Sequence, residues 1–277
     1  MTRPSLSDYG TYDESTVPRL WDGVVGAWCP SLGPTGGRLH DFSRYGNWGT
    51  LTNMDPPTDW VVDGGQYALD FDAVNDYVVA GSLPDFPADC TYSAWGWVYS
   101  GDTGGDCLLL RTTTVFGGAS RNGVSLVMRD GFTGSFIDNV AVEITIGTTR
   151  YRVVSDSTIS RETWTMITGV RRGGTLNLYV NGEKQSGSAT YTGTITNEAQ
   201  TFLGKISDYT PTAARSRADA WCVWNRGLTD GEIRELYLLG RGGMFQRRRR
   251  RRAYVSEAAA KSYLFVNRGQ VIGGGTL

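Results

Sequence analysis

The sequence predicts an all-β protein, an antiparallel β-sandwich with one short helix near its C-terminal end and extended arms at both termini. Short apolar runs rich in β-branched and aromatic residues recur along the chain, separated by clusters of Gly, Asp and Asn. The 37 glycines, 12% aromatic and 20% charged residues are typical of a turn-rich β protein rather than a helical bundle or a disordered chain. A chain of 277 residues can form one large domain with appendages.

The β-rich runs follow one another from residue 24 to residue 225. Asn181-Gly182 predicts a two-residue hairpin turn, because both residues tolerate positive φ. One helix is expected, with Thr229 as N-cap, Glu232 as its capping-box partner and Gly240 at its end. The expected strands are 24–28, 92–99, 107–113, 124–129, 140–147, 163–170, 175–185, 200–206 and 218–225.

The stretch "ALDFDAVNDYVVAG", residues 68–81, reads as strand, turn and strand with carboxylates on one face. Leu69 and Phe71 point to one face, and Asp70 and Asp72 point to the other. Two explanations are open for these oxygens. They either form a solvated Asx-type turn or converge on a ligand.

Three parts are expected along the chain: an N-terminal arm (1–22), a body (23–240), and an arginine-rich linker with a C-terminal anchoring segment (241–277). From residue 241 onward nine basic residues oppose one acid, so this end carries +8 and residues 1–240 carry −9. Six consecutive arginines repel one another and need solvent, phosphate or an acidic partner surface. These are Arg247, Arg248, Arg249, Arg250, Arg251 and Arg252.

The body resembles the LamG-like, concanavalin A-like jelly-roll family of lectins and glucanases. The resemblance lies in residues 23–54, 64–81, 92–99, 176–183, 201–205 and 220–237, in the order typical of the family. It covers roughly residues 20–240 and implies a jelly-roll fold. One departure concerns Ala73, where the family usually has glycine. If the turn needs positive φ there, alanine costs roughly 1 kcal/mol.

The resemblance also implies a calcium ion on the edge of the sandwich. By position, Asp72 and Asn75 would be ligands, and Asp219 would be a more distant contributor. Calcium needs six to eight oxygen ligands, which a strand-turn-strand can partly supply. The alternative is an Asx-turn in which Asp72 and Asn75 bond the backbone. Asp41 and Asn47 are expected to be turn-formers.

No catalytic constellation is evident. Retaining glycosidases on this fold need two adjacent carboxylates, whereas Glu143 is solitary in its strand and His40 is the only histidine. We therefore expect a protein that is not an enzyme. A glycoside hydrolase is the least favoured alternative.

Two tryptophans are candidate stacking platforms for sugar rings. Trp48 and Trp60 lie in loop-like stretches, whereas the tryptophans within strands are expected to be core residues. Cys29, Cys90, Cys107 and Cys222 lack metal-ligand spacing and lie near apolar runs, so buried, reduced thiols are expected.

The leading functional hypothesis is a virion surface protein. The first residues lack the apolar core of a signal peptide, although glycan-binding jelly rolls usually act outside cells. Assembly in the host cytoplasm, followed by release on lysis, would reconcile the two. The chain also resembles structural proteins of tailed bacteriophages, which implies a capsid decoration or a fibre-like projection that displays the lectin-like body. The alternative is a freestanding carbohydrate-binding protein.

The expected partners follow from this hypothesis. The chain would form a homo-oligomer, such as a trimer, contact the major capsid or other virion proteins, and bind surface glycans. Strand addition is expected at Tyr263, Leu264, Phe265 and Val266. No apolar run approaches about 18 residues, so no membrane span is expected, and sequence-specific nucleic-acid binding is not expected either.

Overall fold

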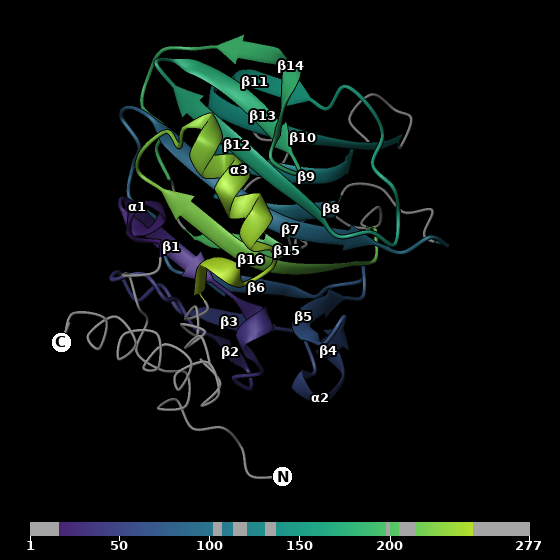
Figure 1. The fold of residues 1–277 in the computed structure, drawn as a ribbon. Helices are drawn as coiled ribbons and strands as arrows, with labels where there is room; N and C mark the ends of the chain where they lie inside the picture. The colour runs from purple at the N-terminus through teal and green to yellow at the C-terminus, as the bar shows by residue number, and fades with distance from the viewer. Residues whose placement is uncertain are drawn as a thin grey trace, which may run out of the picture. The chain divides into compact units, whose positions relative to one another are not determined.

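In the computed structural model, residues 17–101, 107–112, 121–130, 137–197, 200–204 and 214–245 are described. Two antiparallel sheets form a sandwich, and a short helix lies over one of them (Figure 1). The predicted fold class is therefore confirmed for the body, and most of the expected terminal arms lie outside the described residues.

The first sheet has the strand order β14-β13-β12-β7-β16-β5-β4, and β1 also pairs with β16. Its strands are β1 (Val24–Trp28), β4 (Trp60–Asp63), β5 (Gln66–Phe71), β7 (Cys90–Val98), β12 (Thr165–Arg172), β13 (Thr175–Val180), β14 (Glu183–Thr190) and β16 (Ser216–Trp224).

The second sheet has the order β11-β10-β9-β8-β15-β6-β3-β2. Its strands are β2 (Arg38–Leu39), β3 (Gly49–Thr52), β6 (Tyr77–Ala80), β8 (Cys107–Arg111), β9 (Arg121–Asp130), β10 (Ile137–Gly147), β11 (Thr149–Val154) and β15 (Thr201–Gly204). The helical elements are α1 (Pro18–Trp21), α2 (Pro56–Asp59) and α3 (Asp230–Leu239), with 3₁₀ turns η1 (Pro30–Leu32) and η2 (Gly243–Phe245).

The core between the sheets is built by alternation along the strands. Leu69 and Phe71 of β5 are buried in it, as the sequence predicted, together with the fully buried Trp221 of β16. The indole N–H of Trp221 donates to the carbonyl oxygen of Leu109 at 2.7 Å, so this large side chain is buried without an unsatisfied donor. A second apolar cluster lies between the first sheet and α3, where the rings of Trp95 and Tyr237 stack 5.8 Å apart.

Three local predictions are confirmed. Asn181 and Gly182 form the turn between β13 and β14 with φ of 51° and 80°. Thr229 and Glu232 form a reciprocal capping box at the start of α3, and Gly240 follows its last residue. Ala73 has φ of 67°, so the turn after β5 holds an alanine in the left-handed region, at a cost of roughly 1 kcal/mol.

Residues on both sides of the expected body, 23–240, pack against it. Leu20 and Trp21 of α1 are buried, and the indole N–H of Trp224 donates to the carbonyl oxygen of Leu20 at 2.6 Å. Met244 in η2 is buried as well. The compact unit extends to Gln246. Single turns such as α1 and η2 depend on these tertiary contacts, which a local sequence pattern does not reveal.

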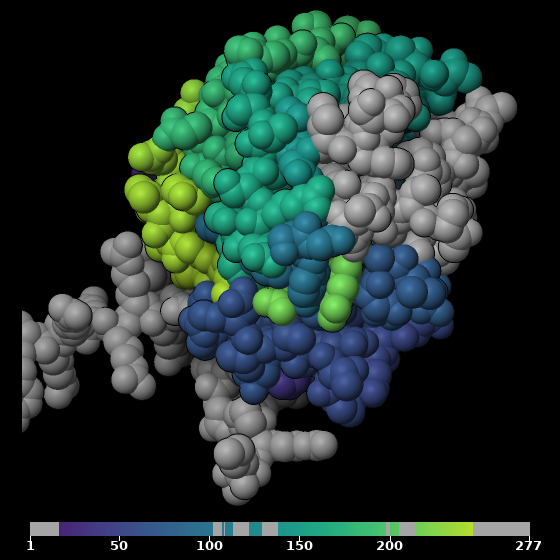
Figure 2. All heavy atoms as spheres, turned by 90° about the vertical axis from the view of Figure 1, so that its right-hand side faces the viewer, coloured from purple at the N-terminus to yellow at the C-terminus, as the bar shows by residue number. Residues whose placement is uncertain are grey.

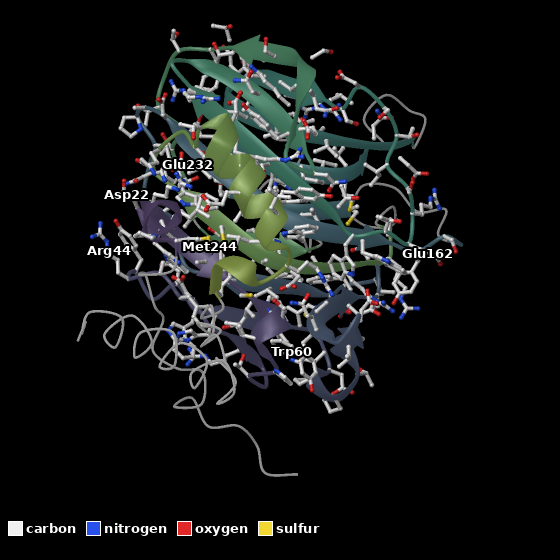
Figure 3. All side chains as sticks on the ribbon, in the orientation of Figure 1. Asp22, Arg44, Trp60, Glu162, Glu232 and Met244 are labelled. Atoms are coloured by element: carbon white, nitrogen blue, oxygen red, sulfur yellow. The ribbon has the colours of Figure 1, made fainter. Side chains whose placement is uncertain are left out.

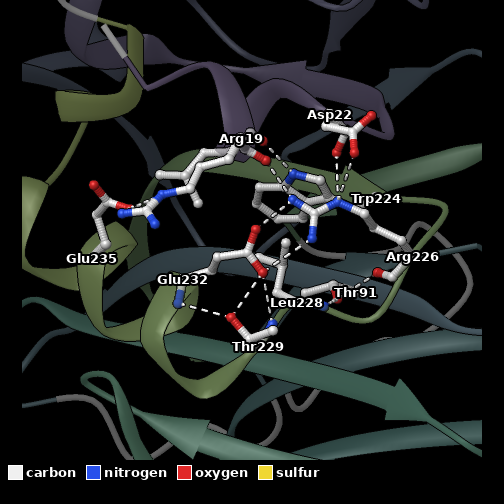
Figure 4. A network of polar contacts seen from close by, with 10 residues as sticks. Arg19, Asp22, Thr91, Trp224, Arg226, Leu228, Thr229, Glu232 and Glu235 are labelled. Atoms are coloured by element: carbon white, nitrogen blue, oxygen red, sulfur yellow. Dashed lines mark hydrogen bonds and ion pairs between the residues drawn. The ribbon is translucent and has the colours of Figure 1, made fainter.

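Glu232 joins the start of α3 to α1 (Figure 4). Its carboxylate accepts hydrogen bonds from Arg226 at 2.7 and 3.1 Å and from the backbone N–H of Thr229 at 2.9 Å. Arg226 also donates to the carbonyl oxygens of Asp22, at 2.8 Å, and Arg19. Burial alone would raise the pKa of Glu232, but the bonds from Arg226 and Thr229 outweigh it and hold this pKa at about 2.

This network predicts a pH-dependent contribution to stability. Because the pKa of Glu232 is about 2 in the folded chain and 4.5 ordinarily, the stabilisation is present above pH 4.5 and is lost as the pH falls toward 2. Glu232→Gln should lower the free energy of unfolding at pH 7 by about 2 to 3 kcal/mol. In acid, the difference between the variant and the wild-type protein should disappear. Urea unfolding at several pH values measures it.

Glu235→Gln is the matched control on the same helix. Glu235 pairs at 2.9 Å with Arg19, whose side chain is 69% exposed, so its removal should cost no more than about 1 kcal/mol. Equal losses for the two variants, or a gap for Glu232→Gln that does not change with pH, would contradict the prediction.

Candidate functional site

The loop between β2 and β3, residues 40–48, is held in place by the buried carboxylate of Asp41. One oxygen accepts the backbone N–H of Ala27 at 2.9 Å and of Ser43 at 2.8 Å. The other accepts the hydroxyl of Ser43 and the backbone N–H of Asn47, both at 2.7 Å. The indole N–H of Trp28 donates to the carbonyl oxygen of Asn47 at 2.7 Å. Asp41 and Asn47 thus act as the expected turn-formers, and the loop is fixed to β1.

This rigid loop presents Trp48 to solvent. The residue is 37% exposed, and its ring meets the His40 ring edge-on at a centroid distance of 4.3 Å. The Arg38 guanidinium carbon lies 5.6 Å from the centroid of the same indole ring. The pairing of Leu39 with Gly49 explains this arrangement, because it places His40 and Trp48 opposite each other where β2 and β3 diverge. An indole flanked by a cation and an imidazole can stack on a sugar ring and hydrogen-bond its hydroxyls.

The lone histidine contributes as a neutral ring. Burial lowers the pKa of His40, and the nearby carboxylate of Asp41 offsets this only in part. His40 is half-buried between Phe42, whose centroid lies 4.6 Å away, and Trp48. This half-buried ring is part of the wall that orients Trp48.

The same loop lines a polar cavity of about 340 Å³ together with α1 and the residues after it. Ser43 and Arg44 form one wall, and Trp21 and Asp22 lie on the other. Asp22 and Arg44 are labelled in Figure 3, near α1. Tyr45 is 44% exposed, with the Arg44 guanidinium carbon 5.3 Å from its ring centroid. The loop therefore presents exposed aromatic rings, and the cavity beside it has opposite charges on its two walls.

Trp60, the second predicted platform, lies inside the fold. It is 7% exposed at the start of β4, packs in the core, and donates its indole N–H to the carbonyl oxygen of Gly36 at 3.1 Å. The structure therefore does not support a stacking role for it. The pairing of β4 with β5 buries this ring, and the preceding "PPTD" only gave it a loop-like context.

Other tryptophans near the surface are covered by arginines. The guanidinium carbon of Arg217 lies 4.5 Å from a ring centroid of Trp97, and that of Arg241 lies 3.9 Å from one of Trp164. Arg217 belongs to β16. In Figure 2, light-green atoms at the start of this strand lie between blue atoms of the first hundred residues and teal atoms of residues 137–197. These arginines lie closer to their rings than Arg38 lies to the ring of Trp48, at 5.6 Å, and Trp97 is 8% exposed whereas Trp48 is 37% exposed.

The residues predicted to bind calcium do not form one site. Asp72 accepts the backbone N–H of Val74 at 2.6 Å and of Asn75 at 3.3 Å, which is the Asx-turn that the sequence left open as the alternative. In the same turn, burial raises the pKa of Asp76 to about 6, and its carboxylate accepts the backbone N–H of Asp72 at 3.0 Å.

Asp219 lies in the middle of β16, away from that turn. Ala218 pairs with Leu69, so Asp219 is separated from Asp72 by four residues along the strands, or roughly 13 Å. Its carboxylate accepts the backbone N–H of Ser31 at 3.0 Å and of Ala220 at 2.7 Å. Among the described residues, no group of three or more His, Cys, Asp or Glu side chains is arranged to hold a metal ion. Asp72, Asn75 and Asp219 do not lie together, as one calcium site would require. Asp219 is therefore removed from the predicted ligand set.

A calcium ion held by Asp72 and Asn75 with backbone oxygens of the turn stays a prediction. Chelator would then lower the melting temperature and added calcium, but not magnesium, would restore it, because a ligand of the folded state stabilises by mass action. Asp72→Ala should abolish the difference between melts with and without chelator. Identical melting curves in chelator and in calcium would contradict the site.

Glu143 of β10 lies among arginines. The Nε atom of Arg150 is 3.1 Å from its carboxylate, and Arg152 pairs with it across the strands. Burial raises the pKa of Glu143, while Arg150 and Arg152 oppose the shift. This setting differs from the paired carboxylates of a retaining glycosidase.

The predicted anchoring residues, Arg247 to Arg252 and Tyr263 to Val266, lie outside the described residues. None of the helices in the described part of the chain is long and apolar enough to cross a membrane.

A family model described as the concanavalin A-like lectin/glucanases superfamily matches residues 72–234, which is more than half of the chain. The chain belongs to this superfamily. This match confirms the resemblance to the concanavalin A-like family that the sequence showed. No curated protein sequence matches the chain significantly.

Solved structures with the same fold include toxin receptor-binding domains. The binding domain of Paraclostridial Mosquitocidal Protein 1 has a TM-score of 0.59 and 18% identity, and the receptor-binding domain of botulinum neurotoxin C/D mosaic serotype has 0.60 and 14%. The ligand-binding domain of botulinum neurotoxin serotype D, solved in complex with N-acetylneuraminic acid, has 0.58 and 12%. Each match covers 79% of this chain and 52% of the other, so the chain spans about half the length of these structures.

Proposed function

We propose that this superfamily member binds glycans, and that the loop of residues 40–48 carries the binding surface. The observation that carries the proposal is the exposed Trp48 ring. Asp41 anchors the loop that holds this ring, and the side chains of Arg38 and His40 lie beside it. A rigid platform limits the conformational entropy lost when a sugar is bound. The membership in a lectin/glucanase superfamily supports the same class of ligand.

The toxin comparison supports this proposal only in general terms. The serotype D domain was solved with N-acetylneuraminic acid, an acidic sugar, and this chain matches about half of that structure. Arg38 and Arg44 would give the loop an affinity for such a carboxylate, with Asp22 on the opposite wall of the cavity as a hydrogen-bond acceptor for hydroxyls.

Trp48→Ala tests the platform. Removal of the indole should weaken glycan binding about tenfold, or ~1.4 kcal/mol, and should change the melting temperature little, because the ring is partly exposed and its N–H donates to none of the described residues. A glycan array followed by calorimetric titration measures the effect on a glycan that the wild-type protein binds.

Leu238→Ala is the control, since this side chain is also exposed but lies on α3. Undiminished binding by Trp48→Ala would refute the assignment to this loop. Failure of the wild-type protein to bind any neutral or acidic glycan of the array would refute the proposed function itself.

We propose binding rather than turnover for this domain. The setting of Glu143 among arginines supports this choice, because a general acid or nucleophile on this fold works beside a second carboxylate.

The biological setting that we propose is display on a virion surface, anchored by residues 247–277. The support is the charge pattern of the sequence, with an acidic body followed by six arginines and the apolar "YLFV" segment. A homo-oligomer, such as a trimer, and a contact with the acidic surface of a major capsid or other virion protein belong to the same proposal.

Truncation after Gln246 separates anchoring from folding. Since the compact unit ends there, the shortened protein should melt like the full chain but fail to join particles or oligomerise. Sedimentation and occupancy in purified particles measure this. Assembly at normal occupancy would contradict the anchoring role, and a free protein in the absence of any particle would favour the freestanding carbohydrate-binding alternative.

A further inference from the structure

A second cavity lies at the opposite edge of the sandwich from Trp48. It has a volume of about 330 Å³ and opens between the β11–β12 connection and the β13–β14 hairpin. In the strand orders, β11 and β14 form one edge of the two sheets, whereas β2 and β3 form the other edge of the second sheet. The two sites are therefore separated by the width of a sheet.

The walls of this corner cavity are fixed by hydrogen bonds. The side chain of Asn139 donates to the carbonyl oxygen of Ser155 at 3.0 Å and to its hydroxyl at 3.1 Å. Across the cavity, the backbone N–H of Asp156 donates to the side-chain oxygen of Gln185 at 2.9 Å, which joins the connection to the hairpin. Asn181 holds the hairpin turn to β12 by accepting the N–H of Met166 at 2.9 Å. The cavity is therefore pre-formed.

The lining carries hydrogen-bonding groups that these contacts do not use. Ser157, Thr158 and Ser160 are exposed, and within the described part of the chain their side-chain hydroxyls have no hydrogen-bond partner. Ile159 and Val180 add two aliphatic surfaces. Hydroxyls that donate and accept, placed beside aliphatic carbon, match the alternating hydroxyl and C–H faces of a sugar ring.

The lining is also uncharged. The neighbouring carboxylate of Asp156 accepts the N–H of Ser186 at 2.8 Å and its hydroxyl at 2.6 Å. The Arg161 guanidinium pairs with Asp138 at 2.9 Å. A ligand carboxylate or ammonium would lose water here without gaining a counter-charge, which disfavours charged ligands.

We propose that this corner cavity is a second saccharide site, which takes a single neutral sugar ring. The proposal rests on the proposed glycan-binding function and adds a ligand class that differs from the one suited to the cationic Trp48 loop. The volume is at the small end of the range of about 300 to 1,000 Å³ for ligand pockets, which suits one ring.

The test uses the full chain and removes the first site. Binding of lactose, maltotriose and cellobiose as neutral probes, and of 3′-sialyllactose as a charged probe, is measured by saturation-transfer NMR and titration. In a Trp48→Ala background, we expect a neutral probe to bind still, and at least tenfold more tightly than 3′-sialyllactose. Adding Thr158→Trp, which fills the cavity, should weaken this binding at least tenfold.

Ser188→Trp in the same background is the control, because Ser188 is exposed on β14 and does not line the cavity; it should leave binding unchanged. Ser160→Tyr replaces Thr158→Trp if melting shows that the latter is unfolded.

The outcomes separate the two proposals. If Trp48→Ala alone abolishes all neutral binding, the glycan-binding function stands and the corner cavity is not a site. Full retention of binding in folded cavity-filling variants, or equal affinity for 3′-sialyllactose, overturns the inference. If the wild-type protein binds none of the probes, the corner cavity is again excluded, and the glycan array then decides the proposed function separately.

Discussion

The architecture depends on the carboxylate of Asp219 at the point where β16 changes partners. Residues 216–218 pair with β5, whereas residues 221–224 pair with β1. The pairing with β7 shifts register between the two stretches, and Ala220 has φ of 48°. A bulge of this kind leaves backbone N–H groups without ladder partners. Asp219 accepts the N–H of Ala220 and that of Ser31 in η1, which fixes both the bulge and the chain after β1.

The same buried acid draws in the segment that follows α3. An Arg241 nitrogen lies 3.9 Å from the Asp219 carboxylate, and another donates to the carbonyl oxygen of Asp63 at 2.7 Å. Burial raises the pKa of Asp219 to about 7, with Arg241 and the N–H groups opposing this shift. The Arg241 side chain also lies over Trp164. One carboxylate thus connects β16, η1 and the C-terminal end of the compact unit, while Asp41 performs a comparable role for the loop of Trp48.

Local signals in the sequence predicted much of the fold. The capping box at Thr229, the turn at Asn181-Gly182 and the positive φ at Ala73 each depend on a few adjacent residues. Asp219 could not be interpreted in this way, because alternation along a strand does not reveal a bulge, and its partners Ser31 and Arg241 are distant in sequence.

The candidate site shows the same limit. Trp48 and Trp60 both follow turn-like sequence, and only the pairing of β4 with β5 buries one of them. His40 and Arg38 were missed as neighbours of Trp48, because β2 pairs with β3 over only two residues, too few to produce a recognisable alternation. The corner cavity is formed by segments about 20 residues apart whose serines and threonines, taken in sequence, resemble an ordinary loop.

The four cysteines have a practical consequence. All of them are buried and none forms a disulfide, and burial raises the pKa of Cys29 and Cys222 and brings that of Cys90 to about 12. The thiolate is the form that reacts with alkylating reagents, and a buried, protonated thiol is inert. A cysteine introduced on the surface would therefore react selectively, so a fluorophore or spin label can be attached at one chosen position while the native thiols stay in place.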